Sequence, residues 1–264
     1  MTYRETESCG PPRVIAALTI VDDGVYRTRR FRSPAYVGDP INAVKLFSDK
    51  GADEIVILDI SGRPFEASRM PLLRSIASEA MMPISYGGGV RDIEDVRSVI
   101  RNGFEKVVLN TALFDSPTLS QDAAREFGAQ AVVGSIEMTR TWLGGMTVLR
   151  DRGRRRVREP LRDWARRCEE RGCGELILTC VGRDGTMTGY DTEAVRLVAE
   201  AVTVPVIAMG GAGTVDHLRA GIHAGASAVA AGSMFVYFGP RRAVLVNYPS
   251  EPLQPVRSAA RDRS

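Results

Sequence analysis

The sequence predicts an α/β protein with a (β/α)8 TIM-barrel fold, built from two similar half-barrels. Eight short apolar runs rich in β-branched residues alternate with segments of helical periodicity, which is typical of a parallel sheet covered by helices. Eight such units favour closure of the sheet into a barrel. The length of 264 residues and the 44% hydrophobic content suit one domain with one large core.

The predicted strands are short enough to be buried on both faces of a parallel sheet. In chain order they are residues 14–21, 55–60, 84–86, 107–109, 131–136, 176–181, 206–208 and 228–231. Apolar residues that recur every three or four positions predict the helices between them. These are residues 40–50, 70–80, 93–102, 117–127, 161–171, 192–201 and 215–224. We therefore expect one barrel domain over residues 12–251, with flexible ends at residues 1–11 and 252–264.

The second half of the predicted barrel repeats the first. Residues 83–113 align with residues 205–235 at a constant offset of 122 and without a gap, and the identities include Gly88 with Gly210. Self-similarity at a fixed offset is the mark of a structural repeat. A doubled half-barrel predicts a doubled binding site, which suits a substrate with two similar ends.

Composition and charge exclude several function classes. The net charge of +3 is mildly basic and does not require nucleic-acid binding. The four cysteines, Cys9, Cys168, Cys173 and Cys180, lack CxxC spacing, and only two histidines could complete a metal site, so we expect neither metal nor cofactor. No stretch approaches twenty apolar residues and no signal pattern opens the chain, which predicts a cytoplasmic protein without a membrane segment.

Two matched glycine-rich loops predict phosphate sites. The sequence YGGGVRD (86–92) follows the third strand and AMGGAGTVD (208–216) follows the seventh, and each leads directly into a helix. Glycine lets backbone N–H groups approach an anion, and the helix N-terminus adds its positive dipole end. For one such loop, tight turns and close packing would explain the glycines. The occurrence of two matched loops, after strands 3 and 7 of a barrel, favours two phosphate sites at its mouth.

The residues expected to bind phosphate lie in these loops and after the strands that follow them. They are Gly88, Gly89, Asn110, Thr111, Gly210, Gly211, Gly232 and Ser233, with Asp184 and Gly185 expected to complete the second site.

Several motifs together resemble the HisF family, the cyclase subunit of imidazole glycerol phosphate synthase. They are RVIAALTI, GADEIVILDI, the GGG loop, KVVLNTA, GRDGTMTGYD (182–191) and MGGAG, and the resemblance covers residues 13–235 almost without gaps. It implies a barrel that takes ammonia from a HisH-type glutaminase at the amino ends of the strands. At their carboxyl ends the barrel would split and cyclise a bis-phosphorylated ribulosyl aminoimidazole substrate.

The resemblance also implies two catalytic aspartates, at the ends of strands 1 and 5. In this sequence the first position is Thr19 and the second is Glu137. A carboxylate with a tuned pKa can exchange a proton near neutral pH, whereas an unassisted threonine hydroxyl cannot. Glu137 keeps the carboxylate on a side chain longer by one methylene. Asp22 or Asp23 could substitute for the missing acid, but the alignment without a shift leaves both in the following loop.

The first residues of strands 1, 2, 4 and 6 match the family's ammonia gate. They are Arg13, Glu54, Lys106 and Glu175, two bases and two acids. The alternative is a ring of salt bridges that only stabilises the barrel, since the amino-end face of such barrels usually serves stability. A chain that keeps the entry ring but loses a catalytic acid indicates a protein that still receives ammonia, for different chemistry.

The sequences at 36–61 and 238–250 resemble HisF-like paralogues associated with surface-polysaccharide pathways. That resemblance implies ammonia transfer from a glutaminase to an amidotransferase that acts on a sugar. The expected partners are a HisH-type glutaminase, an amidotransferase and a phosphorylated small molecule, without nucleic acid or membrane. A working cyclase and a non-catalytic scaffold for the two enzymes remain as alternatives.

Two further features have simple interpretations. The arginine-rich run RDRGRRRVRE (150–159) follows strand 5 and is interpreted as a solvated hairpin turn rather than an anion site. Cys180 ends strand 6, but no histidine at a neighbouring strand end could activate it as a nucleophile. We therefore expect Cys180 to serve packing.

Overall fold

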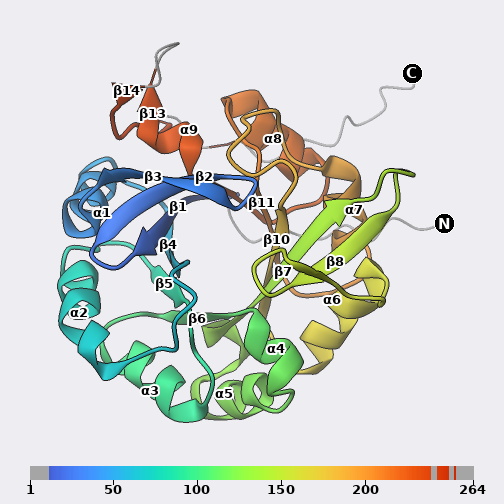
Figure 1. The fold of residues 1–264 in the computed structure, drawn as a ribbon, viewed down its shortest axis with the longest axis horizontal. Coiled ribbons are helices and arrows are strands. Elements are labelled where there is room, and N and C mark those ends of the chain that lie inside the picture. The colour runs from blue at the N-terminus through green and yellow to red at the C-terminus, as the bar shows by residue number, and fades with distance from the viewer. Residues whose placement is uncertain (1–11, 239–242, 250–252, 254–264) are drawn as a thin grey trace, which may run out of the picture.

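The structure is a closed barrel of eight parallel strands surrounded by helices, which confirms the predicted fold class (Figure 1). This computed structural model describes residues 12–238, 243–249 and 253. The barrel strands are β1 (Arg13–Val21), β4 (Glu54–Asp59), β5 (Ile84–Gly87), β6 (Lys106–Leu109), β7 (Val132–Arg140), β10 (Glu175–Cys180), β11 (Val206–Met209) and β12 (Ala228–Ala231). Pairing of β12 with β1 and of β7 with β10 closes the ring.

All seven predicted helices are found, each ending no more than two residues from the predicted end. They are α1 (Pro40–Asp49), α2 (Met70–Ser78), α3 (Ile93–Arg101), α5 (Leu119–Phe127), α6 (Leu161–Glu170), α7 (Thr192–Ala199) and α8 (Val215–His223). Four of them begin with a side chain that accepts a hydrogen bond from a backbone N–H of the first turn, which replaces a missing helical partner. The capping residues are Asp39, Asp92, Asp191 and Thr214.

Alternating side chains of the barrel strands form two separate apolar layers. Along β1, Ile15 and Ala17 belong to the small cluster that fills the barrel interior. The intervening Ala16 and Leu18 belong to the larger cluster between the strands and the helices. Because successive side chains of a strand point to opposite faces, Thr19 continues the interior row toward the carboxyl end of the strand.

The repeat in the sequence is also a repeat in the structure. The elements β5, α3 and β6 of the first half correspond to β11, α8 and β12 of the second, and both bounds of each pair differ by the same 122 positions. Each half then continues into a short helix, α4 (Thr111–Asp115) or α9 (Ser233–Val236), whose first residue lies beside the barrel mouth. The two halves therefore place equivalent backbone at opposite sides of the mouth.

Two hairpins rise from the carboxyl ends of β1 and β7 (Figure 1). The first is formed by β2 (Gly24–Arg29) and β3 (Arg32–Gly38), which the sequence analysis did not predict. In the second, β7 continues past the predicted end to Arg140 and pairs antiparallel with β8 (Met146–Arg150). The β8 strand then pairs with β9 (Arg155–Arg156), so the arginine-rich run forms the expected hairpin turn.

The segment after the barrel packs against its amino-end side. Beyond α9, β13 (Tyr237–Phe238) pairs with β14 (Ala243–Val244). The Tyr248 hydroxyl then donates to the carbonyl of Val14 at 2.7 Å and accepts from the N–H of Asp53 at 3.0 Å. The remaining short elements are the 3-10 helices η1 (Ala67–Arg69) and η2 (Ala129–Ala131).

The predicted flexible ends, residues 1–11 and 252–264, lie outside the described residues apart from Leu253, which is buried. Within the described part of the chain, no helix has the length and apolar character needed to span a membrane.

Candidate functional site

Four charged side chains close the amino end of the barrel interior. They are Arg13, Glu54, Lys106 and Glu175, each the first residue of its strand and here together called the floor ring. Arg13 forms ion pairs with both glutamates. The Lys106 Nζ atom lies 2.9 Å from Glu54 Oε1 and 2.7 Å from Glu175 Oε2. The structure therefore brings all four predicted gate residues together as a closed ring of alternating charge.

Burial makes the ion pairs of the floor ring interdependent. The Glu54 and Glu175 side chains are only 3% and 6% exposed. Burial alone would lower the pKa of Arg13, but the carboxylates of Glu175 and Glu54 raise it above its ordinary value. Removing one partner would leave a buried charge without compensation, so each member depends on its neighbours.

Above the floor ring the interior is first apolar and then polar. The apolar layers contain Ile15, Val56, Val108, Val133 and Ile177 among others. On β7 the interior row continues through Ser135 to Glu137, and on β10 it ends at Thr179, which pairs with Glu137 across the two strands. The Thr179 hydroxyl is buried and has no hydrogen-bond partner among the described residues. The barrel thus joins a charged floor to a polar mouth through an apolar core.

Thr19 lies at the mouth and is committed to a structural hydrogen bond. It is half-buried, and its hydroxyl donates to the backbone carbonyl of Tyr26 on β2. Both substitute acids considered, Asp22 and Asp23, are instead exposed, and Asp22 forms an ion pair with Arg63. The structure therefore places no carboxylate from the β1–β2 turn in the interior row beside Thr19.

Glu137 is a buried carboxyl group at the opposite side of the mouth. It is 8% exposed, and its Oε2 atom accepts from the backbone N–H of Gly153 at 2.7 Å. Burial raises the pKa of Glu137 from an ordinary 4.5 to about 7, against the lowering effect of the Gly153 N–H. A carboxyl group that titrates near neutral pH can both give and take a proton there.

Replacement of Glu137 by Gln is expected to change how stability depends on pH. The folded state holds its proton to a higher pH than the unfolded state, so the contribution of Glu137 is full at low pH and is lost as pH rises through 4.5 to about 7. The free energy of unfolding falls by about 3 kcal/mol over this pH range. Glu137→Gln lacks this loss and keeps an acceptor for Gly153. Urea unfolding at pH 4.5 and 7.5 should show the variant gaining about 3 kcal/mol relative to the unaltered chain; a constant difference would contradict this.

The first glycine loop is packed tightly against backbone. Gly88 and Gly89 follow β5 with φ of 144° and 69°, in the region that favours glycine. A Cβ atom on Gly89 would lie 2.4 Å from the carbonyl oxygen of Arg63. Behind the loop, Arg69 pairs with Asp59 at 2.8 Å. Close backbone approach accounts for the glycines, and phosphate binding by them remains a prediction.

The second glycine loop follows β11 and has the same construction. Gly210 and Gly211 have φ of 87° and 117°, and a Cβ atom on Gly211 would lie 2.3 Å from the carbonyl oxygen of Gly189. Gly189 in turn donates its N–H to the carbonyl of Gly211 at 2.7 Å. The structural repeat therefore includes the packing of each loop on its neighbour.

A buried arginine, missed by the sequence analysis, lies against the second loop region. Arg27 of β2 is 7% exposed, and its guanidinium donates to the carbonyl of Ala17. A Cβ atom on Gly232 would lie 2.0 Å from Arg27 Nη1. Burial lowers the pKa of Arg27 to about 10, partly opposed by Asp184, so the group stays charged at neutral pH. A buried position in the alternating row of β2 was the only available sequence signal.

The other predicted phosphate residues differ in their availability. The Asn110 amide donates to the carbonyl of Ser135 at 2.8 Å, whereas Thr111 is exposed and Ser233 is buried at the start of α9. The Asp184 carboxylate accepts from the Thr28 hydroxyl at 3.1 Å, and Gly185 packs on the backbone of Thr28. These contacts join the loop after β10 to the β2–β3 hairpin.

The described cysteines are free and buried. Burial raises the pKa of Cys180 and raises that of Cys173 to about 12, which disfavours the reactive thiolate. Cys9 lies outside the described residues. Among the described side chains, no group of three or more His, Cys, Asp and Glu residues is arranged to hold a metal ion.

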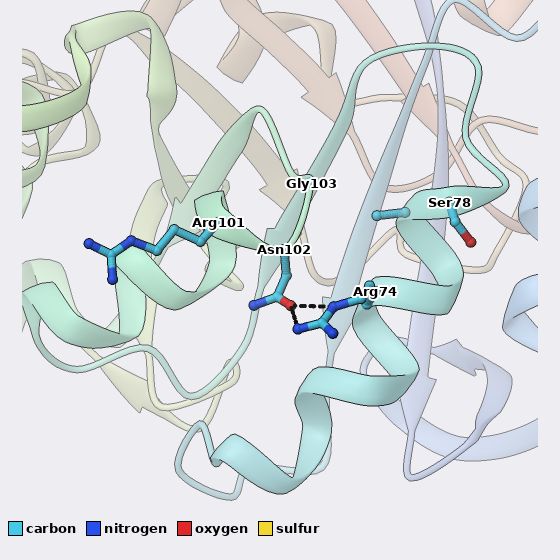
Figure 2. A pocket seen from close by; sticks show the side chains of 6 residues that line it. Arg74, Ser78, Arg101, Asn102 and Gly103 are labelled. Carbon is cyan, nitrogen blue, oxygen red and sulfur yellow. Dashed lines mark hydrogen bonds between the residues drawn. The ribbon is translucent and has the colours of Figure 1, made fainter.

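A separate hollow of about 310 Å³ lies on the outer surface between the ends of α2 and α3 (Figure 2). Its edges are linked by Arg74, which donates from Nε and Nη2 to the Asn102 side-chain oxygen at 3.2 and 3.1 Å. The hollow is wide open and has no connection with the residues of the barrel mouth described above.

Comparison with known proteins gives a consistent result over most of the chain. The family described as "Histidine biosynthesis protein" matches residues 13–240. A Pseudomonas aeruginosa protein named "Putative imidazole glycerol phosphate synthase subunit hisF2" is 42% identical over 239 residues, which cover 90% of this chain and 95% of the relative. The imidazole glycerol phosphate synthase subunit HisF of Metallosphaera sedula is 42% identical over 225 residues, which cover 84% and 89% of the two chains.

Proposed function

Because this chain belongs to the histidine biosynthesis protein family, as a HisF-like relative of the imidazole glycerol phosphate synthase cyclase subunit, we propose that it is an ammonia-conducting barrel subunit. It receives ammonia from a HisH-type glutaminase at the floor ring. The ammonia crosses the barrel and is used at the mouth or beyond it, for amidation of a sugar or a related metabolite.

The observation that carries this proposal is a complete floor ring below an incomplete catalytic pair. All four ring residues are present and paired, whereas Thr19 supplies a hydroxyl that is already bonded to the Tyr26 carbonyl. An ordinary salt-bridge ring would also stabilise the barrel, but these four residues match the family's ammonia gate in both position and charge. Between floor and mouth, apolar side chains offer no acidic group that would protonate ammonia and trap it as ammonium.

The first test is association with a glutaminase. The purified chain, mixed with a HisH-type glutaminase and glutamine, is expected to form a one-to-one complex and to accelerate glutamine hydrolysis. The complex is measured by light scattering and hydrolysis by glutamate release. A chain that neither binds nor stimulates the glutaminase would overturn the proposal.

A working cyclase is the first alternative, and Glu137 favours it. Its pKa of about 7 suits acid and base chemistry. If Glu137 suffices alone, the chain should rescue a histidine auxotroph that lacks its own cyclase subunit. The second alternative, a scaffold that joins a glutaminase to an amidotransferase, needs no conduit and predicts no effect of changes within the floor ring.

A phosphorylated ligand is proposed for the mouth. Arg27 of β2, which lies against Gly232, would be its charged contact at the phosphate site predicted in the second half-barrel. Arg27→Met is expected to weaken binding of glycerol phosphate about 10- to 100-fold, because a hydrogen bond to a charged group is worth about 1.5–3 kcal/mol. Calorimetric titration measures the affinity, and Arg125→Met, on the exposed face of α5, serves as the matched control. Equal affinity of the two variants would exclude this role for Arg27.

A further inference from the structure

The net positive charge of the protein is concentrated in the β2–β3 hairpin and the β8–β9 hairpin. Residues 24–38 and 146–158 contain ten arginines and one aspartate, a net charge of +9. The whole chain has a net charge of +3, so the remainder is net negative. Like charges in such density repel one another and oppose folding, so a compact barrel has no need of them.

The turns of the two hairpins meet over the mouth. Arg30 and Phe31 form the first turn with left-handed φ of 54° and 59°. In the second, a Cβ atom on Gly153 would lie 3.4 Å from the Phe31 ring. The Arg30 N–H also donates to the carbonyl of Asp184 at 2.9 Å, and the Gly153 N–H donates to Glu137. Both turns are therefore fixed to the mouth and to each other.

Six of the exposed arginines around this junction are here called the arginine collar. They are Arg29, Arg30, Arg32, Arg154, Arg155 and Arg156. Among these six arginines, the described residues provide an ion pair only for Arg155, with Asp151 at 3.7 Å. Arg30 donates instead to the backbone carbonyl of Gly182. The charge of the collar is thus almost entirely available to an external partner.

An exposed apolar pair lies in the β7–β8 turn, at the other end of β8 from the β8–β9 turn that contains Gly153. Trp142 is 90% exposed and Leu143 is 76% exposed, in the turn between β7 and β8. Tryptophan and arginine are enriched in the residues that dominate binding energy at protein interfaces. The pair and the collar lie at the two ends of the short strand β8, where Arg140 pairs with Met146 and Arg150 pairs with Arg155. A partner large enough to contact both ends is a protein, since a phosphate or a nucleic acid would leave the apolar pair in water.

We propose that the arginine collar and the Trp142–Leu143 tip form a docking surface for an acidic face of a second protein. This inference rests on the proposed function, since the partner that fits it is the enzyme that consumes the ammonia. A protein docked there would cover the mouth, so ammonia would pass from the barrel to the acceptor without entering bulk water. The glutaminase would occupy the opposite, floor-ring face.

The test begins by finding the protein that contacts the tip. A photo-reactive benzoylphenylalanine replaces Trp142 in cells that contain the native pathway, and in a control it replaces Met81, which is 89% exposed between α2 and β5. The protein cross-linked only from position 142 is identified by mass spectrometry and purified. Its affinity for the unaltered chain is then measured by calorimetry at low and high salt.

The triple variant Arg154→Glu, Arg155→Glu and Arg156→Glu is expected to raise the Kd for that protein at least tenfold, and high salt should weaken binding to the unaltered chain. The matched control carries Arg125→Glu, Arg162→Glu and Arg219→Glu, exposed arginines of three outer helices, and should change the Kd less than twofold. Equal Kd values for the two triple variants, or cross-linking to nucleic acid or the glutaminase alone, would overturn the proposal. Glutaminase stimulation by the collar variant should persist, which separates failure of this surface from failure of the proposed function.

Discussion

Thr19→Asp is expected to give this barrel a cyclase activity that the unaltered chain lacks. The variant places a carboxylate in the interior row of β1, at the mouth shared with Glu137. Positioned acid and base groups contribute about 10²–10⁴-fold each to proton-transfer steps. We therefore expect product formation to rise at least a hundredfold above that of the unaltered chain.

The measurement is a single-turnover assay with the ribulosyl aminoimidazole substrate and excess ammonium salt, read as imidazole glycerol phosphate. Thr19→Asn is the matched control, because it has the shape of aspartate without an ionisable carboxyl group. Thr19→Asp loses the hydrogen bond from Thr19 to the Tyr26 carbonyl, at a cost of about 1 kcal/mol in the free energy of unfolding. Product formation by the unaltered chain would show that it is a working cyclase and would contradict the expectation that Thr19 removes this activity.

Lys106→Met is expected to reduce the transfer of glutamine-derived ammonia at least tenfold. Lys106 bridges Glu54 and Glu175 at 2.9 and 2.7 Å, so its removal leaves Arg13 to balance both buried carboxylates. The ring can then no longer hold its closed geometry at the entrance. Assembly with the glutaminase and glutamine hydrolysis are measured alongside, because Lys106 lies on the face where the glutaminase is proposed to dock.

The measurement compares amide-¹⁵N label in the coupled product with ¹⁵N ammonium released to solution. Breaking a buried ion pair destabilises a protein by about 3–5 kcal/mol, so the double variant Lys106→Met with Glu54→Gln provides a second test in which one basic and one acidic charge are lost together. Lys106→Arg is the matched control that keeps the charge. Unchanged labelling in an intact complex would exclude the conduit and favour the scaffold alternative.

The element pattern of the barrel was predictable because it depends on local properties of the chain. Parallel strands with both faces buried read as short apolar runs, and Asp39, Asp92, Asp191 and Thr214 mark helix starts through bonds to their own first turns. The positions of the floor-ring residues at strand starts also follow from these runs. The β2–β3 hairpin was missed because β3 is largely exposed and lacks the alternation that identifies a half-buried strand.

By itself, the sequence determined the eight-unit barrel, its duplicated halves and the charged residues that begin four strands. Only the tertiary structure decided that Arg27 lies against Gly232, that Gly153 donates to Glu137, and that the two hairpin turns meet over the mouth. The physical reason is distance along the chain. Periodicity and capping act within a few residues, whereas burial, the raised pKa of Glu137 and the closed floor ring arise from segments that only folding brings into contact.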